Sequence, residues 1–165
     1  MSDGPDAFDE ARFRQVVGHF ATGVTVITAE VDGEPTGFTA QSFTSLSLDP
    51  PLVTFFPGKD VASWPVIEAA GAFGVNILGE DQEALCRTFA SKGTDKFEGV
   101  GWRPGRATGS PILEEGVAWL EARIEAVHDG GDHLIVVGRV ADLDVGDGEH
   151  GPLLFYRGGF GRFES

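Results

Sequence analysis

Apolar residues recur in short runs along the chain, and most of these runs have the character of β-strands. The clearest run covers residues 118–127, in which apolar side chains alternate with Glu121, Arg123 and Glu125. A period of two is typical of a strand that turns one face to the core and the other to solvent. We therefore expect these three charged side chains to lie on the outer face.

Six further runs are predicted as strands from their β-branched and aromatic residues and from the turn residues between them. They cover residues 24–31, 36–48, 52–56, 72–78, 134–140 and 153–156. Asp32-Gly33 is a strong signal for a tight hairpin, and Gly130-Gly131 indicates another turn. The Asp-Pro-Pro segment at 49–51 forces a third turn, because proline has no amide hydrogen to donate to a sheet.

Helical spacing is found near the N-terminus. Asp9 is suited to cap a helix that Gly23 would end. The apolar side chains of this helix recur every three or four positions, at Phe13, Val16, Val17 and Phe20.

Two further short helices are predicted in the middle of the chain. Ser63 and Pro65 suit the start of one, which ends near Gly71, and residues 81–90 have the pattern of the other. Residues 92–110 are expected to form an ordered surface loop.

The order of these elements predicts the fold class. The strands and helices do not alternate as in parallel βαβ units, which indicates a mainly β protein: an antiparallel barrel with a few short helices. The length of 165 residues suits one domain of the usual ~100–200 residues. We expect a flexible N-terminal tail at 1–8 and a single domain at 9–165.

Charge and composition exclude several classes of function. The chain has 12 Lys and Arg against 26 Asp and Glu, a net charge of −14, and no basic stripe for nucleic acid or for an anionic membrane surface. A small anionic ligand stays compatible, because charges beyond about 8 Å are largely screened. The N-terminus lacks the pattern of a secretory signal, no apolar run approaches the ~20 residues of a membrane span, and we expect a cytoplasmic protein.

Known catalytic sequence motifs do not indicate a reaction. The chain has no HExxH, CxxC, P-loop or GxSxG sequence, the histidines lack metal spacing, and no metal site is predicted. The single cysteine, Cys86, is expected to be a small buried side chain rather than a nucleophile. No general acid, base or nucleophile is therefore predicted.

The segment GFTAQSFTSLS at 37–47 is the most informative polar stretch. It carries five hydroxyl groups among small neighbours, and hydroxyls with exposed amides can hold a phosphate without cationic side chains. An ordinary edge strand rich in Thr and Ser would have the same composition. Three other polar spots are weak alone: 89–92 at a helix end, Gly131-Asp132-His133 at a strand start, and 156–159 at a turn.

Taken together, these segments resemble a known family. The spacing T-A-x-S-F-x-S-x-S-x-x-P-P from residue 39, with the later G-D-H at 131, is similar to the flavin reductase family with the FMN-binding split-barrel fold. FRQVVGHFATGVTVIT, GAFGVNIL, GSPILEEGVAWLEARI and PLLFYRGGF match in family order, so the resemblance covers about residues 13–160. It implies an antiparallel, Greek-key split barrel.

The resemblance also implies two sets of binding residues. The flavin site would consist of Thr36, Gly37, Phe38, Thr39, Ala40, Gln41, Ser42, Ser45, Ser47, Phe55, Phe56, Pro57 and Ser63, with Phe89, Ala90, Ser91 and Lys92 on its phosphate side. The NAD(P)H contacts would be Gly18, His133, Tyr156, Arg157, Gly158 and Gly159. Gln41 and Arg157 leave the preferred flavin and nucleotide open.

The implied activity is hydride transfer from NADH or NADPH to FMN or FAD, with the reduced flavin passed to a partner monooxygenase. Family members are homodimers with flavin sites near the subunit interface. Cofactor alignment would carry the reaction, in keeping with the absence of an acid–base motif. Three alternatives stay open: a flavin-binding module without turnover, a structural or interaction protein, and a flavoenzyme that reduces another substrate with tightly bound flavin.

Overall fold

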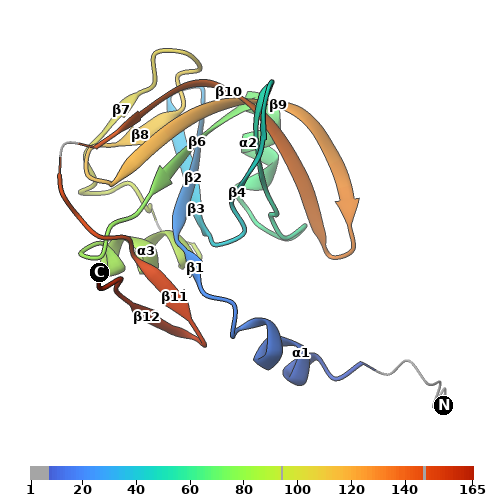
Figure 1. Ribbon diagram of the computed structural model, residues 1–165. Helices are drawn as coiled ribbons and strands as arrows, with labels where there is room; N and C mark the ends of the chain where they lie inside the picture. Colours follow the sequence, from blue (N-terminus) through green and yellow to red (C-terminus); the bar gives the residue numbers. More distant parts are fainter. Residues whose placement is uncertain (1–7, 94, 147) are drawn as a thin grey trace.

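The computed structural model describes residues 8–93, 95–146 and 148–165, and this part of the chain is mainly β with three short helices (Figure 1). Most of the expected tail, residues 1–7, lies outside the described residues. The principal sheet has seven strands in the order β3-β2-β6-β9-β10-β5-β4, and every neighbouring pair is antiparallel, as predicted. In chain order they are β2 (Thr25–Val31), β3 (Glu34–Ala40), β4 (Thr44–Leu48), β5 (Pro51–Phe55), β6 (Ala72–Ile77), β9 (Ala118–Gly130) and β10 (His133–Val145).

Two smaller sheets complete the β-structure. One contains β1 (Thr22–Gly23), β11 (Leu154–Tyr156) and β12 (Gly159–Gly161), and the other pairs β7 (Trp102–Pro104) with β8 (Pro111–Leu113). The predicted loop at 92–110 therefore contains a strand, β7. The sequence did not indicate β7, β8 or β12, which have three residues each, nor the two-residue β1.

The predicted hairpins are confirmed. Asp32 and Gly33 join β2 to β3 with φ angles of 54° and 80°, the left-handed pair that a two-residue turn of this type requires. Gly131 also has a positive φ, 79°, in the turn between β9 and β10. These two strands of 13 residues each form the longest hairpin, and its turn places His133 opposite Gly130.

The single strand predicted at 36–48 is wrong, because the structure divides this segment into β3 and β4 on opposite edges of the sheet. Residues 41–43 connect them, and such a link spans at most about 14 Å. Seven strands laid flat would separate the two edges by about 29 Å. The sheet is therefore strongly curved, yet β3 and β4 do not pair, so it is not closed into the expected barrel.

The first helix, α1 (Glu10–Val17), begins where the sequence predicted. The Asp9 carboxylate accepts a hydrogen bond of 3.2 Å from the amide of Arg12. The helix ends at Gly18 rather than Gly23, which instead belongs to β1. None of its residues is buried. The predicted apolar stripe of Phe13, Val16, Val17 and Phe20 is exposed, Val16 to 62% and Phe20 to 80%.

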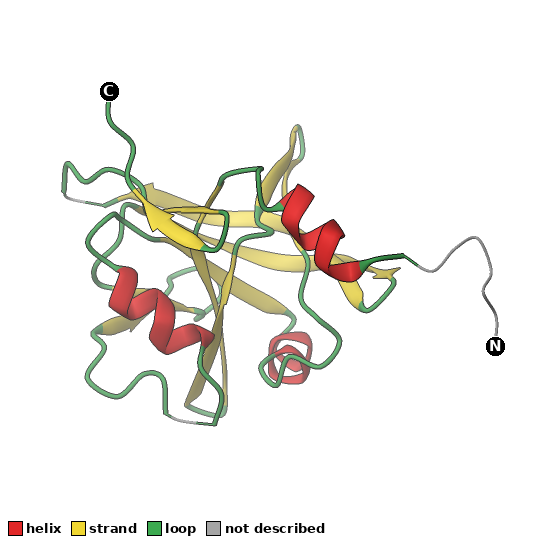
Figure 2. Ribbon diagram, turned by 90° about the horizontal axis from the view of Figure 1, so that it is seen from below, coloured by secondary structure: helices red, strands yellow, loops and turns green. Residues whose placement is uncertain are grey.

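The other helices cover the sheet at separate positions (Figure 2). Both α2 (Trp64–Ala70) and α3 (Glu83–Ala90) match their predictions, and Gly71 ends α2 in the left-handed conformation with φ 69°. A first apolar cluster under α2 centres on Phe55 and Phe73, whose ring centroids lie 4.8 Å apart, and a second lies under α3 around Phe89. No helix in the described part of the chain is long and apolar enough to cross a membrane.

Glu121 corrects the expected outer face of β9. Its side chain is fully buried instead of facing solvent. The carboxylate accepts hydrogen bonds from the Thr108 amide (2.8 Å), the Thr108 hydroxyl (2.7 Å) and the Ala107 amide (3.2 Å). A charged residue is tolerated there because the loop before β8 supplies its hydrogen-bond donors.

Candidate active site

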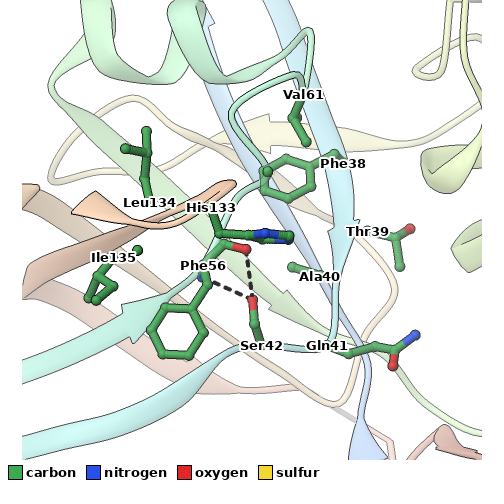
Figure 3. Close-up of a pocket in the computed structure, with 12 residues that line it drawn as sticks. Phe38, Thr39, Ala40, Gln41, Ser42, Phe56, Val61, His133, Leu134 and Ile135 are labelled. Atoms are coloured by element: carbon green, nitrogen blue, oxygen red, sulfur yellow. Dashed lines mark hydrogen bonds between the residues drawn. The ribbon is translucent and has the colours of Figure 1, made fainter. Parts of the chain in front are cut away.

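A cavity of about 650 Å³ lies where β3 approaches the start of β10 (Figure 3). We call it cavity 1. Its wall on the β3 side is formed by residues 38–42, and Phe56 and residues 133–135 form most of the opposite wall. Its volume falls within the range of small-molecule sites, about 300–1,000 Å³. The lining is largely apolar, so cavity 1 suits a flat, uncharged ring system.

Ser42 fixes the connection between the two edges of the sheet beside this cavity. Its hydroxyl oxygen accepts a hydrogen bond of 2.9 Å from the Phe56 amide, and the Phe56 carbonyl lies 3.4 Å away (Figure 3). Residues 41–43 are thereby attached to the end of β5. The cavity is thus a consequence of the curvature that brings β3 near β5 and β10.

His133 is the titratable side chain of cavity 1, and its ring extends from β10 toward β3 (Figure 3). Its Nδ1 lies 2.7 Å from the Asp132 carboxylate, which leaves Nε2 for a ligand. The hydrogen bond and the charge of His133 lower the pKa of Asp132. Backbone hydrogen bonds from Leu134 to Pro57 and from Lys59 to Asp132 hold the flanking segments in place.

A second cavity, of about 570 Å³, adjoins the first, and we call it cavity 2. Both are lined by Phe38, Thr39 and Val61. Cavity 2 extends along the start of β3 to the N-terminus of α2 and to residues 89–93 and 95–97, at and after the end of α3. It is more polar than cavity 1, because hydroxyl, carboxylate and ammonium groups line it.

A hydrogen-bond network ties the wall of cavity 2 together. The Gly37 carbonyl accepts hydrogen bonds from the Ser63 hydroxyl (3.1 Å) and the Lys96 ammonium (3.2 Å). The Thr36 hydroxyl donates to the Ser63 hydroxyl at 3.0 Å, and Lys96 also donates to the Phe89 carbonyl at 3.1 Å. Desolvation lowers the pKa of Lys96. The Gly37 carbonyl of β3 is therefore linked directly to Ser63 at the start of α2, and through Lys96 to the end of α3.

The free edge of β3 offers peptide groups to both cavities. The Gly37 carbonyl points away from β2, since it accepts from groups outside the sheet. Peptide groups alternate along an antiparallel strand, so the amide and carbonyl of Thr39 face the same side. The Thr39 hydroxyl donates to the Cys86 carbonyl at 2.6 Å, which attaches β3 to α3. A ligand could thus be bound by peptide donors and acceptors.

Comparisons with known proteins identify the family of the chain. Residues 17–164 match the family model of the flavin reductase like domain. The chain belongs to this family.

Similar proteins include a reductase subunit of a flavin-dependent monooxygenase and a flavin oxidoreductase. The reductase subunit HsaB of a flavin-dependent monooxygenase from Rhodococcus jostii is 50% identical over 153 residues, which cover 93% of this chain and 77% of that protein. The structure of nitrilotriacetate monooxygenase component B from Mycobacterium thermoresistibile has a TM-score of 0.92 at 48% identity, covering 94% of this chain and 87% of the other. The NADH:FAD oxidoreductase SgcE6 of Streptomyces globisporus, in complex with NAD and FAD fragments, has a TM-score of 0.89 at 40% identity, covering 94% and 93%.

Most residues that the family resemblance assigned to flavin line the two cavities. These are Thr36 to Ser42 on β3 and after it, Phe56, Ser63, and Phe89 to Lys92. The Phe55 side chain lies in the core, and the Pro57 carbonyl supports β10. Ser45 and Ser47 lie on β4 and line neither cavity.

The residues assigned to NAD(P)H fall into two groups. His133 lines cavity 1, whereas Gly18 and the 156–159 turn lie together elsewhere, joined by a 3.0 Å hydrogen bond from the Arg157 amide to the Gly18 carbonyl. The Tyr156 ring also meets the His19 ring edge-on at 6.2 Å between centroids. Gly18 and residues 156–159 line neither cavity 1 nor cavity 2.

Cys86 and Lys96 are two further residues at the site. Cys86 is buried, as predicted, and desolvation raises the pKa of its thiol, which disfavours the reactive thiolate form. Lys96, which the sequence did not single out, lines cavity 2. The signal that could have indicated it is a second lysine close behind Lys92 in a glycine-containing loop.

Proposed function

We propose that the protein is an NAD(P)H:flavin oxidoreductase, which transfers a hydride from NADH or NADPH to FMN or FAD and passes the reduced flavin to a partner monooxygenase. The observation that carries the proposal is the pair of adjoining cavities along the free edge of β3, one apolar and one polar. Membership of the flavin reductase family supports it, as do relatives named as an NADH:FAD oxidoreductase and as a monooxygenase reductase subunit.

The residues present fit a flavin nucleotide. Phe38, Ala40 and Phe56 give cavity 1 the apolar surface that an isoalloxazine ring needs. The peptide groups of Thr39 suit the polar edge of that ring. The ammonium and hydroxyl groups of cavity 2 suit the ribityl phosphate, which is the anionic part of the molecule.

In this proposal the protein binds and aligns, and the two cofactors supply the redox chemistry. His133 donates or accepts one hydrogen bond through Nε2 and thereby positions the nicotinamide nucleotide at the mouth of cavity 1. Asp132 keeps the imidazole in that orientation through Nδ1. The apolar lining excludes water from the face on which the two rings meet.

We further propose that the curved sheet is a split barrel. The three-residue link between β3 and β4 supports this, because it holds the two unpaired edges near each other. Cavity 1 lies beside this link, between β3 on one side and Phe56 and the start of β10 on the other.

A homodimer is part of the same proposal. The apolar stripe of α1 is exposed in the single chain, and a second copy would bury it. The separation of Gly18 and the 156–159 turn from His133 also suits a dimer, since one protomer could then complete the nucleotide site of its partner. This would place the flavin sites beside the subunit interface.

The deciding experiment measures NADH and NADPH oxidation by purified protein with and without added FMN or FAD. We expect oxidation that rises hyperbolically with flavin concentration, because flavin is an exchangeable substrate. Flavin binding without NAD(P)H oxidation would instead identify a binding module. A rate independent of added flavin, with flavin retained on gel filtration, would indicate an enzyme that reduces another substrate.

A further inference from the structure

Lys96 holds an unusual position on the wall of cavity 2. The charged side chains that line the described part of this cavity are Asp60, Lys92, Asp95 and Lys96. Lys92 is exposed, whereas Lys96 is half-buried and its ammonium donates to the carbonyls of Gly37 and Phe89. Of the two lysines, Lys96 is therefore the one whose charge has a fixed place.

The geometry of Lys96 leaves capacity for a ligand. An ammonium group has three hydrogen-bond donors, and the two backbone carbonyls use two of them. Among the described residues, no carboxylate lies within ion-pair distance of its Nζ. One donor and most of the positive charge thus stay available.

The surroundings explain why a fixed cation is needed here. The chain carries a net charge of −14, which disfavours the approach of a phosphate dianion. Because salt screens charges beyond about 8 Å, a cation in direct contact with the phosphate affects its binding more than the distant acidic residues do. The Phe89 carbonyl lies in the last turn of α3, where the helix dipole favours a cation and helps to hold it.

We propose that Lys96 binds the phosphate of the flavin nucleotide and makes the protein select FMN and FAD over riboflavin. The inference rests on the proposed function and adds to it a residue and a specificity. The phosphate belongs to the flavin rather than to NAD(P)H, because cavity 2 continues directly from the apolar cavity 1 through Phe38, Thr39 and Val61. The lowered pKa of Lys96 accords with an ammonium that lacks a counter-ion until the phosphate arrives.

The test compares Lys96→Met, which keeps the aliphatic stem, with Lys92→Met as the matched control. Dissociation constants for FMN and riboflavin are measured by fluorescence titration. We expect Lys96→Met to weaken FMN binding by about tenfold or more, the size of a lost charge-assisted hydrogen bond, and to change riboflavin binding by less than about threefold. Lys92→Met should weaken FMN binding less, and its effect should fade with added salt.

Equal loss of FMN and riboflavin affinity in Lys96→Met would overturn the proposal, because Lys96 would then only support the cavity wall. Unchanged FMN affinity would overturn it as well. A wild-type protein that binds neither flavin would refute the proposed function itself.

A second measurement needs no variant, in case Lys96→Met does not fold. Inorganic phosphate should compete with FMN for the wild-type protein and leave riboflavin binding unchanged. Titration of NADH KM against phosphate separates the other source of phosphate: a rise in NADH KM with no effect on FMN would assign the anion site to the nicotinamide nucleotide and contradict the proposal.

Discussion

Replacement of Glu121 by alanine should destabilise the protein far more than its place on a strand surface suggests. The carboxylate is fully buried and accepts three hydrogen bonds from Ala107 and Thr108. The loop packs so closely that a Cβ added at Gly105 would collide with the Glu121 carboxylate. Without Glu121, two backbone amides and one hydroxyl lose their acceptor in a partly buried loop.

The magnitude follows from these three groups. An unsatisfied buried donor costs about 1–3 kcal/mol, and partial access of water to this loop favours the lower end of that range. We therefore expect Glu121→Ala to lower the free energy of unfolding by about 3 kcal/mol, a large part of a typical total of 5–15 kcal/mol. Glu121→Gln keeps one acceptor oxygen and should cost about 1–2 kcal/mol.

Urea unfolding of the flavin-free protein, followed by circular dichroism, measures the effect. With a slope of about 2 kcal/mol per molar urea, the midpoint of Glu121→Ala should fall by about 1.5 M. Glu125→Ala is the matched control, since Glu125 lies on the same strand in an exposed ion pair with Arg139 and its loss should change the midpoint little. Equal midpoints for the two variants would refute the reasoning.

Three further predictions concern the site and its assembly. His133→Ala should raise the KM for NAD(P)H about tenfold in steady-state kinetics and leave flavin affinity nearly unchanged. The control is His128→Ala, at an exposed histidine. An equal loss of affinity for NAD(P)H and for flavin would contradict the role of His133. Gly37→Ala should destabilise the protein by about 1–3 kcal/mol and weaken flavin binding, because its Cβ would lie 2.9 Å from the Ile27 carbonyl. The control is Gly161→Ala, whose Cβ would meet nothing within 4 Å and which should leave the midpoint of the same urea titration unchanged. Val16→Asp should shift the molar mass from light scattering toward the monomer, and an unchanged mass would remove α1 from the interface.

Local signals predicted those parts of the fold that local physics decides. Asp32-Gly33 adopts the left-handed backbone that its composition predicts, and Gly71 ends α2 for the same reason. Asp9 caps α1 because a short acceptor side chain satisfies a free amide wherever a helix begins. Each of these features depends on neighbours within a few residues, so the sequence is sufficient.

Two wrong predictions share a different cause, because both depend on contacts distant in sequence. Residues 36–48 have a continuous strand composition, and only the pairing of β3 with β2 and of β4 with β5 divides them. Glu121 has the period of an outer-face residue, but the loop at 105–110 folds over it. A period of two shows which side chains share a face and does not show what covers that face.

The same distinction explains how much of the candidate site the sequence could reveal. Residues 36–42 and 89–92 were assigned through a family resemblance, and the structure brings them to the same two cavities. The resemblance assigned Lys92, with residues 89–91, to the phosphate side of the flavin site. Lys96 has no such neighbourhood in sequence, and its role depends on two carbonyls, Gly37 and Phe89, that come from a strand and a helix far from each other in the chain. A cation becomes useful for binding when the fold restricts where it can go, and that restriction is a property of the packed structure rather than of the motif.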